Sequence, residues 1–216
     1  MKTTLFCLAA LLAGIILSGC SQQITLFNGQ NLDGWDMYLQ DKNTEPAAVW
    51  SVQDGVIHCK GKPTGYLRTK EDYSNYKLHV EWRWPEKPTN SGVLLHAAGE
   101  DKLWPLSVEA QLQHGSAGDF VTIQAGSAIT VNGQQYTPPG GERFYKIIAK
   151  QHESSENPPG QWNSYDIICK GGGIQLTVNG VLQNTAAEST LVSGAICLQS
   201  EGSPIEFKNI ILTPLK

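Results

Sequence analysis

The sequence predicts an all-β protein built as a β-sandwich or jelly roll, and two observations carry this prediction. Short runs of alternating apolar and polar residues recur along the chain, which is the period of a strand with one buried face. The runs are separated by dipeptides that tolerate the positive φ of tight hairpin turns, such as Asp54-Gly55, Asn132-Gly133 and Asn179-Gly180. Convincing helical periodicity is hard to find, so the pattern favours packed sheets over a βαβ fold.

Composition narrows the class of protein further. The 216 residues are 40% hydrophobic and carry 16 Lys plus Arg against 20 Asp plus Glu, a net charge of -4. The hydrophobic fraction is too high for a disordered chain. No basic cluster offers the electrostatic footprint that a nucleic acid requires, so we expect no nucleic-acid partner. Neutral small molecules such as sugars remain compatible with this charge.

The N-terminus resembles that of an exported bacterial lipoprotein. Lys2 gives a positive start, residues 5–17 are almost continuously apolar, and Leu17-Ser18-Gly19-Cys20 resembles the lipobox. The apolar run is too short for a comfortable membrane span. A buried N-terminal helix with an incidental cysteine is the alternative.

We therefore expect residues 1–19 to be a signal peptide, and Cys20 to carry a lipid that is the only membrane attachment. Residues 20–23 would be a linker and residues 24–216 one domain. Acidic residues do not follow Cys20 closely, which favours a location that faces the periplasm.

Three cysteines remain in the expected domain, namely Cys59, Cys169 and Cys197. They either form one disulfide and leave one free thiol, or lie buried as three small apolar side chains. Their spacing matches no zinc-binding pattern.

Two hairpins are expected in chain order. Residues 49–52 and 56–59 flank Asp54-Gly55, and residues 174–178 and 181–182 flank Asn179-Gly180. The stretches 138–141 and 154–160 are rich in Pro, Gly and Ser and are expected to be long surface loops.

Two longer strands present polar rows. In residues 76–84, apolar side chains alternate with Lys77, His79, Glu81 and Arg83, and in residues 106–113 they alternate with Ser107, Glu109, Gln111 and Gln113. Successive side chains take opposite faces of a strand. If both polar rows belong to one concave sheet, they would form a sugar site. Alternatively, both are the solvated outer faces of antiparallel sheets.

Seven segments in order resemble landmarks of one family. They are Leu26 to Trp35, Asn90-Ser91-Gly92-Val93, Glu109-Ala110-Gln111-Leu112, Gln161-Trp162-Asn163, Val178-Asn179-Gly180, Gly194 to Gln199 and Ile205 to Ile210. On these segments the chain resembles the 3-keto-disaccharide hydrolase-like family over residues 24–213. The resemblance implies a concanavalin A-like jelly roll that acts on glycosides oxidised to a ketone at C3.

The resemblance also implies site residues. The family's motif positions fall on Asn90, Glu109, Gln111 and Gln199, and this chain has His96 and His114 where the family often has Arg and Asp.

The chemistry of such a substrate can be argued from the sugar itself. A C3 ketone acidifies the C2 proton, so a base can remove it, form an enediolate and expel the C1 substituent, after which water adds. This route needs one base and an electrophile at the developing oxyanion. Ordinary glycosidases use two carboxylates across the glycosidic bond, and no such paired-carboxylate strand is evident.

We expect Glu109, His114 and His96 to be catalytic. The same three side chains are a plausible His/carboxylate set for a divalent metal, which is the one cofactor that the candidates suggest. The substrate-binding candidates are Asn90, Gln111, Gln199, Glu81 and Trp104. Trp162 is expected to be a core residue, because large aromatics in sheet proteins usually are.

The favoured function is therefore an enzyme that cleaves 3-keto-glycosides or 3-keto-disaccharides by elimination and hydration. A noncatalytic carbohydrate-binding lipoprotein is the main alternative, since polar and aromatic side chains can hold a sugar without a base. A structural surface lipoprotein is a third.

Overall fold

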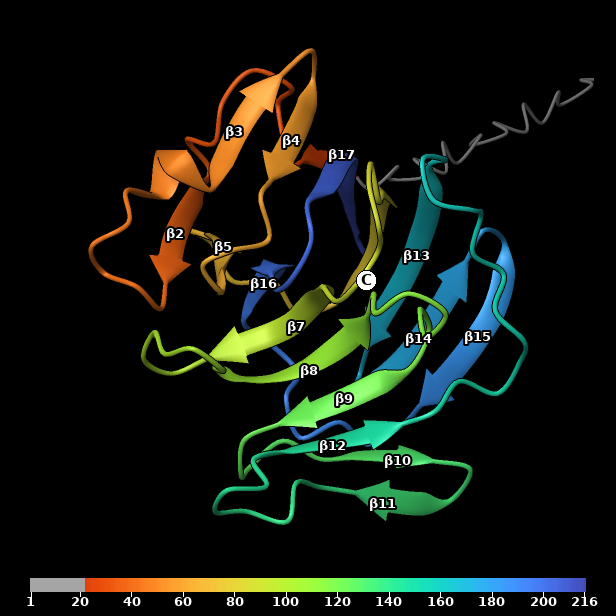
Figure 1. The fold of residues 1–216 in the computed structure, drawn as a ribbon. Coiled ribbons are helices and arrows are strands. Elements are labelled where there is room, and N and C mark those ends of the chain that lie inside the picture. Colours follow the sequence, from red (N-terminus) through yellow and green to blue (C-terminus); the bar gives the residue numbers. More distant parts are fainter. Residues whose placement is uncertain (1–21) are drawn as a thin grey trace, which may run out of the picture.

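The structure, a computed structural model, describes residues 22–216 (Figure 1). Within them, two antiparallel sheets pack face to face as a sandwich. Sheet A has the strand order β15 (Val181–Ala186), β14 (Gly173–Val178), β13 (Asn163–Lys170), β6 (Tyr76–Arg83), β17 (Ile205–Pro214), β4 (Val56–Cys59) and β3 (Trp50–Gln53), with β1 (Ile24–Thr25) paired to β17. Sheet B has the order β12 (Tyr145–Ile148), β9 (Phe120–Ile123), β8 (Leu106–Gln111), β7 (Gly92–Ala98), β16 (Ala195–Ser200), β5 (Gly65–Thr69) and β2 (Trp35–Leu39). The predicted all-β jelly-roll class is confirmed.

Two small elements complete the described chain. A hairpin of β10 (Ile129–Val131) and β11 (Gln134–Tyr136) is joined near the end of β15 by a bridge between Thr130 and Ala187, and residues Pro46–Ala48 form a single 3-10 turn. Among residues 22–216, no helix is long and apolar enough to cross a membrane. The predicted signal peptide and the lipid-bearing Cys20 lie outside the described residues.

The predicted hairpins form where the turn dipeptides indicated. Asp54 and Gly55 join β3 to β4 with φ values of 52° and 76°. Asn179 and Gly180 join β14 to β15 with φ values of 48° and 79°. Asn, Asp and Gly tolerate this left-handed region better than other residues, which explains their place between the strands.

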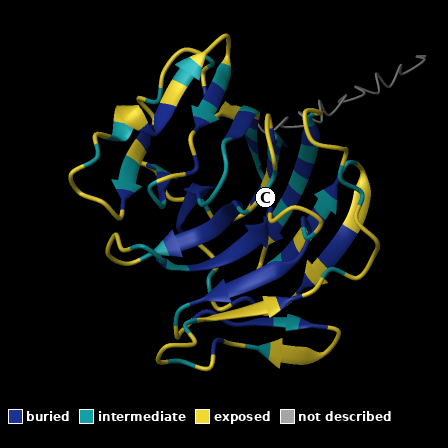
Figure 2. Ribbon diagram, in the orientation of Figure 1, coloured by how far each residue is buried: buried dark blue, intermediate teal, exposed yellow. Residues whose placement is uncertain are grey.

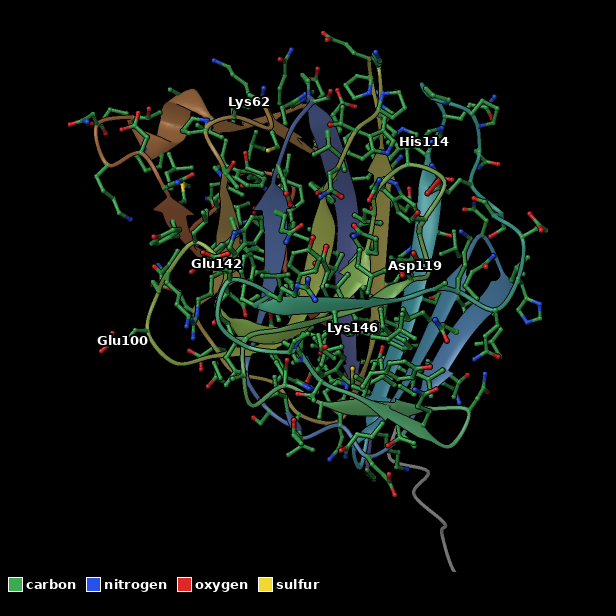
Figure 3. The ribbon with its side chains drawn as sticks, turned by 60° about the horizontal axis from the view of Figure 1, so that its bottom comes forward. Lys62, Glu100, His114, Asp119, Glu142 and Lys146 are labelled. Carbon is green, nitrogen blue, oxygen red and sulfur yellow. The ribbon has the colours of Figure 1, made fainter. Side chains whose placement is uncertain are left out.

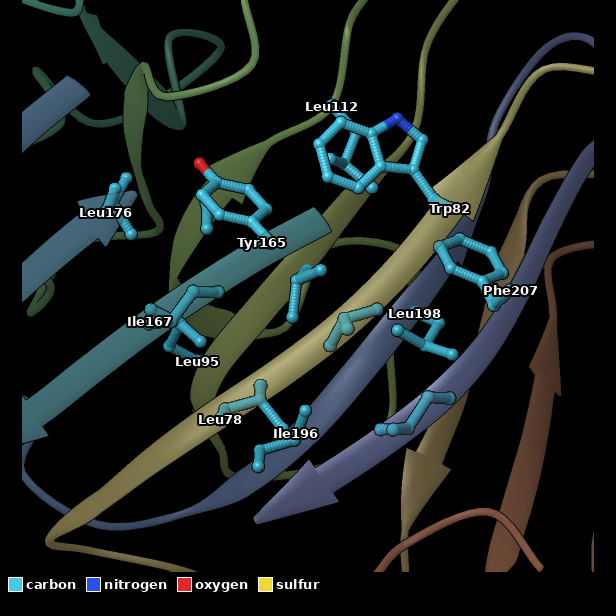
Figure 4. Close-up of a cluster of buried hydrophobic side chains, with 14 of the residues drawn as sticks. Leu78, Trp82, Leu95, Leu112, Tyr165, Ile167, Leu176, Ile196, Leu198 and Phe207 are labelled. Carbon is cyan, nitrogen blue, oxygen red and sulfur yellow. The ribbon is translucent and has the colours of Figure 1, made fainter. Parts of the chain in front are cut away.

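The core lies between the two sheets and follows the alternation along β6 and β8 (Figure 4). Leu78 and Trp82 point into it from sheet A, and Val108 and Ala110 from sheet B; all four are fully buried. Cys59, Cys169 and Cys197 are buried, with no disulfide partner among the described residues. The second alternative for the cysteines, three buried thiols, is therefore the correct one.

The other face of sheet B, its outer face, is also covered. Leu94, Val121 and Cys197 on this face belong to a second, smaller apolar cluster, against which Trp104 and Phe144 pack. Figure 2 shows the consequence, since β7, β8 and β9 are buried along most of their length whereas β12 is mainly exposed. A strand covered on both faces can hold a polar side chain out of water, and β8 does so.

Candidate active site

A pocket of about 200 Å³ opens on the outer face of sheet B. Its lining is divided between polar and apolar side chains. The polar lining residues are Asn90, Glu109, Gln111, Gln113 and Glu201, and the apolar ones are Trp104, Val121, Ile123, Phe144, Tyr145 and Ile147. Three substrate-binding candidates predicted from the sequence, Asn90, Gln111 and Trp104, therefore line the same pocket as Glu109.

Glu109 is the most strongly perturbed acid of the pocket. Its alternation along β8 turns it away from the core, where it lies between Leu94 of β7 and Val121 of β9. The residue is only 4% exposed, and no described residue hydrogen-bonds to its Oε1. Burial raises the pKa of Glu109 well above its usual value, and the charge of Glu201 adds to this rise, while the Gln199 amide opposes it. A buried carboxyl with a raised pKa is typical of groups that take part in proton transfer.

Gly92 provides the space that the Glu109 carboxyl occupies. It pairs with Gln111 across β7 and β8, and a Cβ at this position would overlap the carboxyl of Glu109 and approach Oε1 of Gln199. Both the Oε1 and Nε2 atoms of Gln199 are buried and have no hydrogen-bond partner within residues 22–216. The Gln199 amide therefore lies next to Gly92, close to the Glu109 carboxyl.

Gln111 is held in one orientation by the backbone. Its Oε1 accepts hydrogen bonds from the amides of Leu112 and Gln113, at 2.9 and 2.8 Å. Because the oxygen is engaged in this way, Nε2 is left as a donor in the pocket. A fixed donor beside a proton-exchanging carboxyl is the pair that an enolate-forming reaction needs.

Glu201 is a pocket residue that the sequence interpretation missed. It forms a backbone bridge with Asn90, and burial raises its pKa, with the Asn90 side chain opposing the rise. One signal could have found it. Glu201 lies two residues after Gln199, so the alternation along β16 and beyond it places the two side chains on the same face.

The apolar side of the pocket is an aromatic wall on a fixed backbone. The rings of Trp104 and Phe144 stack with centroids 6.1 Å apart, and Phe144 meets Tyr145 edge-on at 5.3 Å. Gln124 joins the two segments, because its side-chain Nε2 donates to the carbonyl of Trp104 and its backbone amide donates to that of Phe144. The wall is therefore built before any ligand arrives.

His96 does not reach this pocket, which corrects its predicted catalytic role. A bulge in β7 between Leu95 and Ala98, with φ of 52° at His96, turns the ring toward Tyr76 of sheet A. The ring is 3% exposed, and its Nδ1 and Nε2 lie 2.9 and 3.2 Å from the carbonyl oxygens of Leu191 and Ser74. His96 is an interior histidine whose ring nitrogens face backbone carbonyl oxygens and not the pocket.

His114 is also separate from the pocket lining. It lies on the loop after β8, labelled in Figure 3, and its Nδ1 is 3.3 Å from Glu156, whose carboxylate also accepts hydrogen bonds from the Gly115 and Ala117 amides. The predicted metal set of Glu109, His96 and His114 therefore does not converge. Within residues 22–216, no group of three or more His, Cys, Asp and Glu side chains is placed to hold a metal ion.

Glu81 belongs to the other sheet, so the structure does not bring it together with Glu109 as the sequence predicted. It lies on the outer face of sheet A, where Asn209 donates a hydrogen bond at 2.8 Å and Lys208 forms an ion pair at 3.3 Å. A sandwich has two outer faces, and the alternation within one strand cannot tell which of them a polar row joins.

Trp162 is not the core residue that we expected. It is partly exposed on the outer face of sheet A, with Lys208 Nζ 4.1 Å and Arg83 Cζ 4.8 Å from its ring centroid. Cation–π contacts explain how so large a ring is kept outside the sandwich.

Comparison with solved structures supports the fold. A protein from Parabacteroides distasonis ATCC 8503, named as a candidate glycosyl hydrolase, aligns with a TM-score of 0.64 and 23% identity over 90% of this chain and 94% of that one. Carbohydrate-binding module CBM66 from Bacillus subtilis aligns with a TM-score of 0.58 and 10% identity, over 82% and 93% of the two chains. The β-glucanase of Bacillus licheniformis aligns with a TM-score of 0.54 and 15% identity, over 92% and 100%. At these identities the likeness concerns the fold alone.

Comparison with protein families reaches further. A 3-keto-disaccharide hydrolase from Bacteroides thetaiotaomicron (strain VPI-5482) is 27% identical over 40% of this chain, and the alignment spans 34% of that relative's length. The family model described as a 3-keto-alpha-glucoside-1,2-lyase-like domain matches residues 22–213. This match covers both sheets and every residue of the pocket, so the chain belongs to the 3-keto-alpha-glucoside-1,2-lyase-like family.

Proposed function

We propose that this protein cleaves 3-keto-glycosides by removing the C2 proton, expelling the C1 substituent and adding water. One observation carries the proposal, namely the buried Glu109 with its unpartnered Oε1 at a sugar-sized pocket of a protein in this family. A carboxyl whose pKa is raised by burial is a stronger base than an exposed one, as proton abstraction next to a ketone requires.

In the first step the Glu109 carboxylate accepts the C2 proton. The electrons of the C2–H bond form the C2–C3 double bond of an enediolate, and negative charge moves to the ketone oxygen. Gln111 Nε2, held by the backbone contacts of its oxygen, is the donor that supports this charge. A positioned donor of this kind contributes about two to three decades of rate.

In the second step the enediolate returns its electrons to the ring. The C3 carbonyl and a C1–C2 double bond form, and the C1–O bond breaks. The C2 proton held by the Glu109 carboxyl passes to the departing oxygen, which leaves as the alcohol. Water then adds at C1 and gives one proton to the Glu109 carboxylate, and this proton moves to C2, so the net result is hydrolysis to a free 3-keto sugar and an alcohol.

The proposal is tested by replacing Glu with Gln at the assigned base, Glu109, and at a control position, Glu81. Glu109→Gln keeps the shape of the side chain but removes the base, so we expect kcat/KM for a methyl 3-keto-glucoside to fall at least about a hundredfold. Glu81→Gln makes the same change on the outer face of sheet A, where we expect kcat/KM to stay within about twofold of wild type. Near-wild-type turnover by Glu109→Gln would refute the assigned base.

A noncatalytic sugar-binding function is the second candidate, and the fold shared with CBM66 and the aromatic wall favour it. It predicts that the wild-type protein binds 3-keto-glycosides, with loss of binding when Trp104 is replaced by Ala, but releases no alcohol from either anomer.

A further inference from the structure

The lining of the pocket changes from polar to apolar between strand β8 and the strands β9 and β12. Glu109 on β8 pairs with Val121 on β9, and Val121 pairs with Ile147 on β12. Neighbouring strands lie about 4.8 Å apart, so the aliphatic side chains begin one strand away from the reacting carboxyl. The polar residues Asn90 and Glu201 lie on the opposite side of Glu109, beside β7 and β16.

The two halves of the pocket suit different chemistry. Asn90, Gln111 and Glu201 can exchange hydrogen bonds with the hydroxyl groups of a sugar ring. The half beyond Glu109 consists of Val121, Ile123 and Ile147 together with the rings of Trp104, Phe144 and Tyr145. The three aliphatic side chains contain no hydrogen-bonding atom, so hydroxyl groups placed against them would lose water without replacement, which is unfavourable.

Two large residues of the apolar half are exposed to solvent. Tyr145 and Ile147 are 49% and 46% exposed at the pocket, although both are large and apolar. Their strand is fixed by pairing with β9, and the neighbouring rings are fixed through Gln124. A preformed apolar surface next to a polar sugar site binds an apolar group at low ordering cost.

We propose that this apolar half is the site of the leaving group, and that the preferred substrates are 3-keto-glycosides with an apolar aglycone rather than a second sugar. The inference rests on the proposed function, because Glu109 at C2 fixes which neighbouring surface the C1 substituent meets. With the sugar on the side of Asn90 and Glu201, the C1 oxygen is directed toward β9 and β12.

The test compares an apolar leaving group with a polar one. Benzyl 3-keto-glucoside and a 3-keto-disaccharide of the same anomeric configuration both release an alcohol, and the sugar hydroxyl is the more acidic of the two. Acidity therefore favours the disaccharide, so a ratio of kcat/KM in favour of the benzyl compound reports recognition of the leaving group. We expect a ratio of at least ten in favour of the benzyl compound. The ratio should fall about tenfold in Ile147→Ser and stay within twofold in Leu182→Ser, because Leu182 has the same 46% exposure but lies on β15 of sheet A.

Each outcome decides between the two proposals. Turnover with a ratio near or below one, or an unchanged ratio in Ile147→Ser, overturns the aglycone inference while leaving the proposed function intact. Absence of turnover of the methyl, benzyl and disaccharide compounds refutes the proposed function. In that case calorimetry with unoxidised benzyl glucoside and glucosyl-glucose still decides the inference, since equal affinities, or no binding of either, contradict an apolar site.

Discussion

Glu109 owes its altered acidity to apolar neighbours that come from other strands. Alternation along β8 predicts which face the side chain takes, but its burial depends on Leu94, Val121 and the segments that cover the outer face of sheet B. The sequence therefore singled out Glu109, Gln111, Asn90 and Trp104, which line one pocket. It missed Glu201, although alternation continued two residues beyond Gln199 would have placed the Glu201 side chain on the same face.

The protonation of Glu109 has a consequence for stability. Its raised pKa means that the folded protein retains a proton that the unfolded chain loses above a pH of about 4.3. The free energy of unfolding contributed by this group therefore falls as the pH rises above that value. We expect Glu109→Gln to gain stability relative to wild type between pH 4 and pH 8, as measured by urea midpoints.

Glu81→Gln provides the control of opposite sign. Burial alone would raise the pKa of Glu81. Hydrogen bonds from Asn209 and Lys208 nevertheless hold this pKa below its usual value. The stability that Glu81 contributes is present above the pKa of the unfolded chain and is lost as the pH falls through the folded value. The Glu81→Gln variant should therefore be less stable than wild type at pH 8. If the urea midpoints of Glu109→Gln and Glu81→Gln shifted in the same direction, the burial assigned to Glu109 would be contradicted.

Gly92 is expected to matter for activity more than for folding. In Gly92→Ala the new methyl group would displace the carboxyl of Glu109, which is the end of a flexible side chain and can move. We expect at least a tenfold loss of kcat/KM with a melting temperature within a few degrees of wild type. Gly34→Ala is the control, since its Cβ would lie at an ordinary 3.7 Å from the nearest atom; equal activity of the two variants would disprove the role of Gly92.

At the scale of the element, alternation along β6 and β8 predicts which face of the strand each side chain takes. It does not predict which of the two sheets the strand joins. Trp82 and Leu78 are buried and Glu81 is on the opposite side of the strand, as expected. Membership of sheet A or sheet B depends on pairings between residues far apart in sequence, such as β6 with β13 and β17. The bulge in β7 is a second limit, because alternation from Leu94 would place His96 on the pocket face.

The face assignment of β6 can be measured directly. Trp82 is fully buried between the sheets, and we expect Trp82→Ala to lower the free energy of unfolding by about 3 to 5 kcal/mol. Arg83→Ala should cost much less, because Arg83 is on the outer face, where it contacts Glu206 and the Trp162 ring. Equal urea midpoints for the two variants would show that the faces are wrongly assigned.

At the scale of the whole molecule, the sandwich places one reactive pocket on the outer face of sheet B. The packing of sheet A against the inner face of sheet B holds β7, β8 and β16 rigid, and these strands position Gly92, Glu109 and Gln199. The resemblance of seven short segments predicted both the fold and the family, because such segments mark turns and site strands. It could not predict which histidines reach the pocket, since that depends on a bulge and a loop.

The most direct test of the central claim is exchange of the C2 proton. We expect wild-type protein in deuterated buffer to incorporate deuterium at C2 of a 3-keto-glycoside or of its released sugar, detected by NMR as loss of the C2–H signal. Glu109→Gln should lower the exchange rate at least about a hundredfold, with Glu81→Gln unchanged. Release of the alcohol with the original hydrogen fully retained at C2, or equal exchange in Glu109→Gln, would contradict proton abstraction by Glu109.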